Sequence, residues 1–191
     1  MSRSKMLKKL LVSQGNACDL PDLTSFIQLP RENLQQKFCE TLHSIGGSSS
    51  QLEEQIPLEI QVRNVYPDAK RIEFKGFQKE GAWISASPHS LKDIDVLVVH
   101  GLLGVAENGA IWLTEKQLGQ RIAPFIAEYV VVVLQEAALV ATMHEAYQAI
   151  EKTEPYEFGV FIAGPSKTAD IEQSLVIGAH GARGLHVLLE R

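Results

Sequence analysis

The chain has 191 residues, of which 45% are hydrophobic and 21% charged, as in an ordinary globular protein whose core needs no disulfide or metal staple. The net charge of −5, from 18 basic and 23 acidic residues, excludes the concentrated basic surface of a nucleic-acid-binding protein. Two cysteines, Cys18 and Cys39, are too few for a secreted disulfide framework or for the four ligands of an iron–sulfur cluster.

The N-terminal segment is basic. It carries Arg3, Lys5, Lys8 and Lys9, and no acidic residue occurs among the first eighteen residues. The apolar run behind these charges, residues 10–12, is too short for a signal peptide, and no run in the chain is long enough to span a bilayer. We therefore expect a basic N-terminal helix on a cytoplasmic protein.

Residues 31–45 predict a helix, because apolar residues recur on one helical face: Leu34, Phe38, Leu42 and Ile45. Gly46 and Gly47 end this helix, and the serines at 48–50 continue the break. We interpret residues 15–30 as a loop, and the apolar spacing of residues 52–60 predicts another helix. Residues 1–50 are therefore expected to be an N-terminal helical extension, and residues 51–191 the main domain.

The pattern of apolar residues changes from about residue 94 onward. Short apolar runs bounded by turn residues predict buried strands at 94–99, 110–113, 129–134, 160–163 and 185–189. Helices are expected between the last three, over about 140–150 and 171–177. Alternating strands and helices predict an α/β fold with a largely parallel sheet.

The segment from Gly164 to Glu172, Gly-Pro-Ser-Lys-Thr-Ala-Asp-Ile-Glu, leaves one predicted strand and enters a predicted helix. Ligands of open α/β sheets lie beyond strand ends, and helix-start amides attract anions. Gly164, Ser166, Lys167 and Thr168 are therefore candidate anion-binding residues. The alternative is a plain turn in which Asp170 caps the helix. The spacing does not match a nucleotide-binding P-loop.

The segment from Gly178 to Val187 contains three glycines before the last predicted strand. His180 is a candidate acid or base, and Arg183 a candidate carboxylate clamp. The alternative is a glycine-rich turn whose histidine caps a helix end. His186 is a weaker candidate, because it lies within a strand pattern.

The segment from Gly104 to Ile111 contains Asn108-Gly109, a strong turn signal between two predicted strands. Glu107 and Asn108 would project at a strand end, although their chemistry alone favours the alternative, a hairpin with ordinary polar tips. Arg121 either binds an anion or covers apolar surface with its stem. No metal site is expected, since Gln148 stands where the second ligand of a zinc-protease helix would be.

These three segments, in this order, resemble the C-terminal signature of the LUD-domain family, and within it the lactate-utilisation protein C group. The resemblance covers roughly residues 93–190. The chain departs from the family pattern in having Lys167 in place of Arg, and Ala182-Arg183-Gly184 in place of Pro-Arg-Glu.

The resemblance implies a three-layer α/β/α fold similar to the phosphosugar isomerase and CoA-transferase group. It also implies a role in oxidising L-lactate to pyruvate, with iron–sulfur clusters in partner proteins and no cofactor on this chain. The family supplies no established catalytic residues, so His180, Asp170 and Glu107 are candidates from the residues alone.

Two other functions stay open. One is an autonomous transferase or isomerase acting on an anionic acyl-CoA or sugar phosphate, with Glu107 as a covalent nucleophile. The other is a non-catalytic ligand-sensing or interaction subunit that docks through the N-terminal helices. In each case, fold analogy alone is weak support for function.

Overall fold

The structure is a computed structural model that describes residues 3–13, 33–77, 81–171 and 174–191. The basic N-terminal segment forms helix α1 (Arg3–Ser13), as predicted, and residues 3–12 are all exposed. The predicted loop over residues 15–30 lies outside the described residues.

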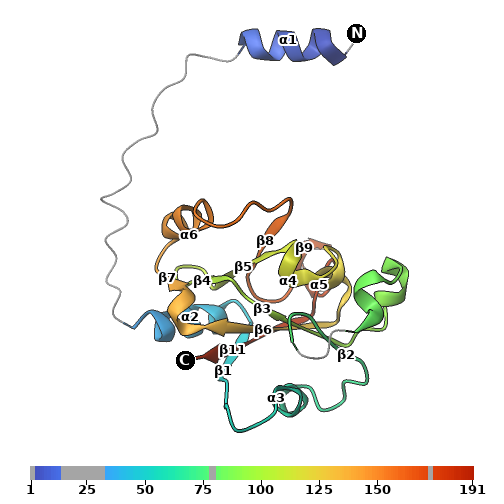
Figure 1. Cartoon of the computed structure of the whole chain (residues 1–191), viewed down its shortest axis with the longest axis vertical. Helices are drawn as coiled ribbons and strands as arrows, with labels where there is room; N and C mark the ends of the chain where they lie inside the picture. Colours follow the sequence, from blue (N-terminus) through green and yellow to red (C-terminus); the bar gives the residue numbers. More distant parts are fainter. Residues whose placement is uncertain (1–2, 14–32, 78–80, 172–173) are drawn as a thin grey trace.

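A five-stranded parallel sheet forms the centre of the molecule (Figure 1). Its strands lie in the order β1 (Ser48–Gln51), β11 (Gly184–Glu190), β6 (Tyr129–Gln135), β3 (Val96–His100) and β2 (Ile72–Phe74). Strands β3, β6 and β11 confirm the predicted buried runs. Each has Val or Leu on both faces, as expected for strands covered on both sides.

Both faces of this sheet are covered. Helix α3 (Leu58–Val65) packs Val62 against one face, together with Val131 and Leu188. The other face buries a larger core that includes Phe38, Leu97 and Leu134. The short helices on this side are α4 (Glu115–Leu118), α5 (Ala123–Ile126), η2 (Ala82–Ser85) and η3 (Pro88–Leu91).

The predicted runs at 110–113 and 160–163 are strands, but they belong to a second sheet. Its order is β7 (Leu139–Val140), β4 (Leu103–Val105), β5 (Ala110–Thr114) and β8 (Gly159–Ile162), and β5 pairs antiparallel with both neighbours. The short helix η4 (Glu136–Ala138) leads into β7, and helix α6 (Met143–Ile150) packs Ala146 and Ile150 on the outer face. Because β5 is covered on both faces, its sequence pattern is the same as that of a central strand.

Residues 34–50, which the sequence placed in an extension, contribute to the main body. Helix α2 (Leu34–Ser44) buries Phe38 and Leu42 completely in the core. The serines at 48–50 form edge strand β1, which pairs with β11. The helix expected at 52–60 begins later, at Leu58, because β1 and a turn precede it.

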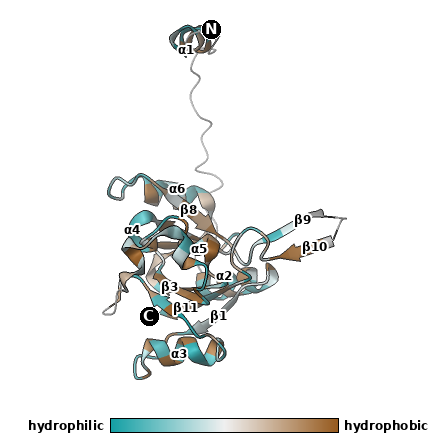
Figure 2. Ribbon diagram, turned by 90° about the vertical axis from the view of Figure 1, so that its right-hand side faces the viewer, coloured by the Kyte–Doolittle hydropathy of each residue, from teal (hydrophilic) through white to brown (hydrophobic). Residues whose placement is uncertain are grey.

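The helix predicted over 171–177 is wrong. Residues there form the antiparallel hairpin of β9 (Lys167–Ile171) and β10 (Ser174–Ile177), which Figure 2 shows extending from the body as an arm. The β-branched residues Thr168, Val176 and Ile177 favour a strand over a helix.

The architecture is α/β with a mostly parallel central sheet between helical layers, and it is consistent with the predicted three-layer α/β/α arrangement. One outer layer also contains the four-stranded second sheet. Within the described parts of the chain, no helix has the length and apolar character needed to cross a membrane.

Candidate functional site

Two of the signature segments meet in a cavity of about 210 Å³ at the end of β8. Ser166 is held from both sides by the glycine loop: its N–H donates to the Ala182 carbonyl over 2.8 Å, and its carbonyl accepts from the Gly178 N–H over 2.9 Å. The cavity, which we call the glycine-loop cavity, is lined by Pro124, Phe125, residues 160–163, Gly164, Pro165, Ser166, His180, Gly181 and Ala182.

Two glycines allow this close approach of the two segments. Gly164 has φ +69°, and a Cβ there would lie 3.0 Å from the Ile45 carbonyl oxygen. A Cβ on Gly181 would lie 3.2 Å from Cβ of Ser166, which is tighter than ordinary packing. Larger residues at these positions would therefore deform the cavity.

The lining combines an apolar wall with two polar side chains. Phe125 and Phe161 supply the apolar part, whereas Ser166 offers a hydroxyl that both donates and accepts hydrogen bonds. His180 is exposed at the cavity, and its imidazole can take up or release a proton. The arrangement suits a small ligand with one polar and one apolar end.

The three predicted cations do not line this cavity. Lys167 donates from Nζ to the carbonyl of Ile45, at the C-terminal end of α2, where the helix dipole favours positive charge. Arg183 pairs with Glu128 at 2.7 Å. Because β9 starts at Lys167, the residues after Ser166 lead away into the hairpin rather than into a helix start.

Arg121 also has a structural partner. It pairs with Glu157 at 2.8 Å, and its guanidinium carbon lies 5.5 Å from the centroid of the Phe158 ring. It therefore covers apolar surface, which was the second of the two readings that the sequence allowed.

Two further candidates lie in the hairpin. Thr168 pairs with Val176 across β9 and β10, and Asp170 lies within strand β9. The expectation that Asp170 caps a helix is therefore wrong, because no helix begins there. Any role of its carboxyl group in catalysis stays a prediction, since the side chain lies outside the described part of the structure.

Glu107 and Asn108 lie at the turn between β4 and β5. The Asn108 side-chain oxygen accepts from the Ala110 N–H at 3.0 Å, which stabilises the turn. A Glu107 oxygen accepts from the Met143 N–H at 2.9 Å, at the start of α6. Both side chains thus have structural partners, and the nucleophilic role of Glu107 stays a prediction.

Ile45 contacts two of the three signature segments. A Cβ on Gly109 would lie 3.2 Å from Ile45 Cδ1, and one on Gly164 would lie 3.3 Å from the same atom. Lys167 reaches the Ile45 carbonyl from the other direction. The sequence identified Ile45 only as the last apolar residue of a helical face, so this central position was missed.

His186, the weaker histidine candidate, is buried between serines of the edge strand. Its Nδ1 lies 2.8 Å from the Ser48 hydroxyl, and its Nε2 lies 3.0 Å from the Ser50 hydroxyl. Burial, with a smaller contribution from His43, lowers the pKa of His186 to about 4. A neutral imidazole has one donor and one acceptor, so the two hydroxyls satisfy it as a structural group.

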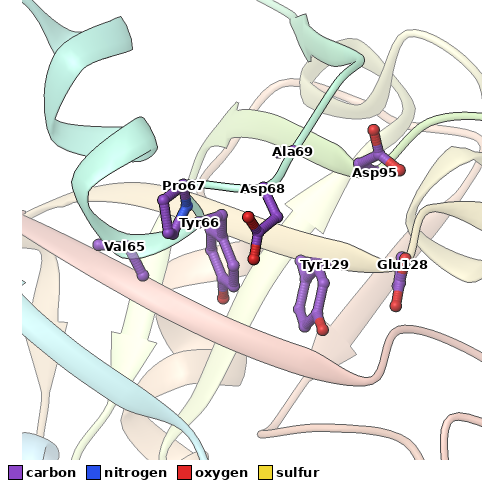
Figure 3. Close-up of a pocket in the computed structure, with 8 residues that line it drawn as sticks. All are labelled: Val65, Tyr66, Pro67, Asp68, Ala69, Asp95, Glu128 and Tyr129. Atoms are coloured by element: carbon purple, nitrogen blue, oxygen red, sulfur yellow. The ribbon is translucent and has the colours of Figure 1, made fainter.

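A second cavity, of about 310 Å³, lies at the amino-terminal edge of the parallel sheet (Figure 3). The ring centroids of Tyr66 and Tyr129 lie 4.5 Å apart. Burial of Tyr66, with a smaller contribution from Tyr129, raises the pKa of Tyr66 to about 12. Asp95 accepts from the Lys70 and Arg71 N–H groups at 2.7 Å each, which is a structural role.

Sequence reasoning singled out none of the residues around this second cavity. They come from separate segments, and no motif marks them. The glycine-loop cavity, by contrast, is lined by residues of two signature segments, Gly164 to Ser166 and His180 to Ala182. We therefore take the glycine-loop cavity as the candidate site.

Fold and site together define an α/β protein with a loop-built cavity of small-molecule size. The sequence profile of the LUD domain matches residues 20–189, so the chain belongs to the LUD domain family.

Three curated relatives are similar over part of their length, and each is named Lactate utilization protein C. The protein of Bacillus pumilus (strain SAFR-032) is 33% identical over 92 residues, which are 45% of this chain and 38% of the relative. The protein of Shouchella clausii (strain KSM-K16) is also 33% identical over 92 residues, which are 46% of this chain and 40% of the relative. The protein of Anoxybacillus flavithermus is 32% identical over 77 residues. The matched segment thus spans less than half the length of these relatives.

Among solved structures, a DUF162 family protein from Deinococcus radiodurans is similar in fold. The TM-score is 0.63 at 16% sequence identity, and the match covers 85% of this chain and 99% of that one. This similarity confirms the α/β fold class.

Proposed function

We propose that the chain is the cluster-free subunit of a cytoplasmic, iron–sulfur-dependent complex that oxidises L-lactate to pyruvate. The observation that carries the proposal is the similarity to proteins named Lactate utilization protein C, together with a cavity of about 210 Å³ that Ser166 and His180 line. Two cysteines are too few to hold a cluster on this chain, so the clusters belong to partner proteins.

The chemistry of L-lactate fits this lining. Oxidation to pyruvate breaks the hydroxyl O–H bond and the Cα–H bond of L-lactate, and it releases two electrons and two protons. The electrons pass to the iron–sulfur partners, and the Cα proton is released to solvent. In this proposal the Ser166 hydroxyl donates to the substrate carboxylate, and the His180 imidazole accepts the proton of the substrate hydroxyl. Phe125 and Phe161 contact the methyl group.

Reconstitution tests this function. The purified chain alone is expected to be inactive, and adding the iron–sulfur proteins with which it assembles should produce reduction of their clusters that depends on L-lactate. Cluster reduction is followed by bleaching of visible absorbance. If partners with intact clusters assemble with the chain but stay oxidised in L-lactate, the proposal is wrong.

Variants then test the cavity itself. Ser166→Ala and His180→Phe should each lower the rate by about a hundredfold, as is usual for the loss of a positioned proton-transfer or hydrogen-bonding group. Lys167→Met is the matched control, because Lys167 is adjacent in sequence but bonds to the end of α2. Equal losses in all three variants would show that the cavity has no special role.

A further inference from the structure

Helix α1 has an apolar stripe that faces solvent. Met6, Leu7, Leu10 and Leu11 are 52%, 49%, 58% and 65% exposed. At 100° per residue, these positions fall within an arc of about 140° on one side of the helix. Such a stripe is the kind of surface that a helix normally buries.

The opposite side of α1 is basic. Lys5, Lys8 and Lys9 lie there, whereas Arg3, in the first turn, lies on the side of the stripe, and no acidic residue occurs in the helix. The chain as a whole has a net charge of −5, so α1 is a local concentration of positive charge on an acidic protein. A surface that covers the stripe must therefore also favour cations.

The composition of α1 favours a lipid surface over a protein groove. Protein interfaces depend on aromatic and arginine anchors that fit particular pockets, and residues 3–13 contain no aromatic residue and a single arginine, Arg3, in the first turn. Leucine and methionine instead enter the acyl region of a bilayer without a fixed partner, and lysines extend their stems to reach the headgroups. With 11 residues, the helix is too short to cross the bilayer.

The length of α1 also indicates that its apolar face packs against another surface. Helices shorter than about 12–15 residues are marginal in water unless their apolar face packs against something. Residues 3–12 are all exposed, so the α/β body does not bury that face.

We propose that α1 lies in the plane of an anionic lipid surface and attaches the protein to it. The four leucine and methionine side chains enter the acyl boundary, and the basic residues contact anionic headgroups. Binding is reversible, because one short amphipathic helix provides limited apolar area.

Vesicle co-sedimentation of the full chain tests this proposal. At low ionic strength, the chain should sediment with vesicles of phosphatidylcholine and phosphatidylglycerol but remain in solution with phosphatidylcholine alone. Added salt should release it, because salt screens the lysines. Failure to bind the anionic vesicles, or equal binding to both kinds, would overturn the proposal.

Two charge-matched variants locate the binding face. Leu10→Glu and Val12→Glu each add one negative charge to α1, but only Leu10 lies in the apolar stripe, whereas Val12 lies between the lysines and is 87% exposed. Leu10→Glu should weaken binding about tenfold more than Val12→Glu, since it also removes a leucine that enters the acyl boundary of the bilayer. Equal effects would contradict the proposal, as would saturable binding of a purified partner protein that depends on Leu10 when vesicles do not bind.

Discussion

The buried His186 should make the stability of the protein fall as the pH falls from 6.5 towards 4. In the unfolded chain a histidine titrates near its ordinary pKa of 6.5, whereas burial lowers the pKa of His186 to about 4 in the folded chain. Between these values, the unfolded state binds a proton that the folded state does not. The imidazole therefore costs nothing above pH 6.5, and its cost grows until the pH reaches the folded pKa.

The size of this effect follows from the two pKa values. Between pH 7 and pH 5, His186 should remove about 2 kcal/mol from the free energy of unfolding, at 1.36 kcal/mol per pKa unit. His186→Gln keeps a side chain that donates and accepts but cannot be protonated. Urea unfolding at both pH values should show a smaller loss for the variant than for the wild type, by about 2 kcal/mol. Parallel losses in the two proteins would refute the assignment of the low pKa to His186.

Three other substitutions test the packing and the site. Gly159→Ala should destabilise the protein by about 2 kcal/mol in urea unfolding, because the new Cβ would lie 2.1 Å from Cη2 of the buried Trp112; an unchanged midpoint would contradict this packing. Lys167→Met should lower the free energy of unfolding by about 1 kcal/mol in the same assay, because it removes the hydrogen bond to the end of α2. It should leave the affinity for L-lactate unchanged, and a large loss of affinity would support Lys167 as an anion-binding residue. Glu107→Gln should lower the free energy of unfolding by about 0.5 kcal/mol, since the amide oxygen still accepts from the Met143 N–H but lacks the charge that favours a helix start. Complete loss of turnover in the reconstituted complex would instead support the hypothesis that Glu107 is a nucleophile.

The central strands were predictable because of where they lie. Strands β3, β6 and β11 are buried on both faces, so each is a short apolar run that ends at turn residues. The same rule predicted β5 and β8 as strands but could not assign them to a second sheet, because the composition of an apolar run does not show which strands it pairs with. Edge strand β1 was missed, since its three serines read as a break and only the pairing with β11 makes them a strand.

The candidate site was predictable in part. Gly164, Ser166 and His180 come together because two glycine-containing loops meet, and the glycines were visible in the sequence. Lys167 and Arg183 lie next to these loops in sequence, but their side chains reach Ile45 and Glu128, so they do not line the cavity and their role in anion binding stays a prediction. Those partners are more than 50 residues away along the chain, and no local pattern identifies them.

In the proposed function, the glycine-loop cavity binds the carboxylate and hydroxyl ends of L-lactate. The most sensitive test is a titration of the full chain with L-lactate, followed by the side-chain NMR resonances of its histidines and tyrosines. We expect saturable shifts of the His180 imidazole that disappear in Ser166→Ala, with His186 unaffected because it is buried away from the cavity. Shifts confined to residues of the Tyr66 and Tyr129 cavity, with His180 unchanged, would contradict it.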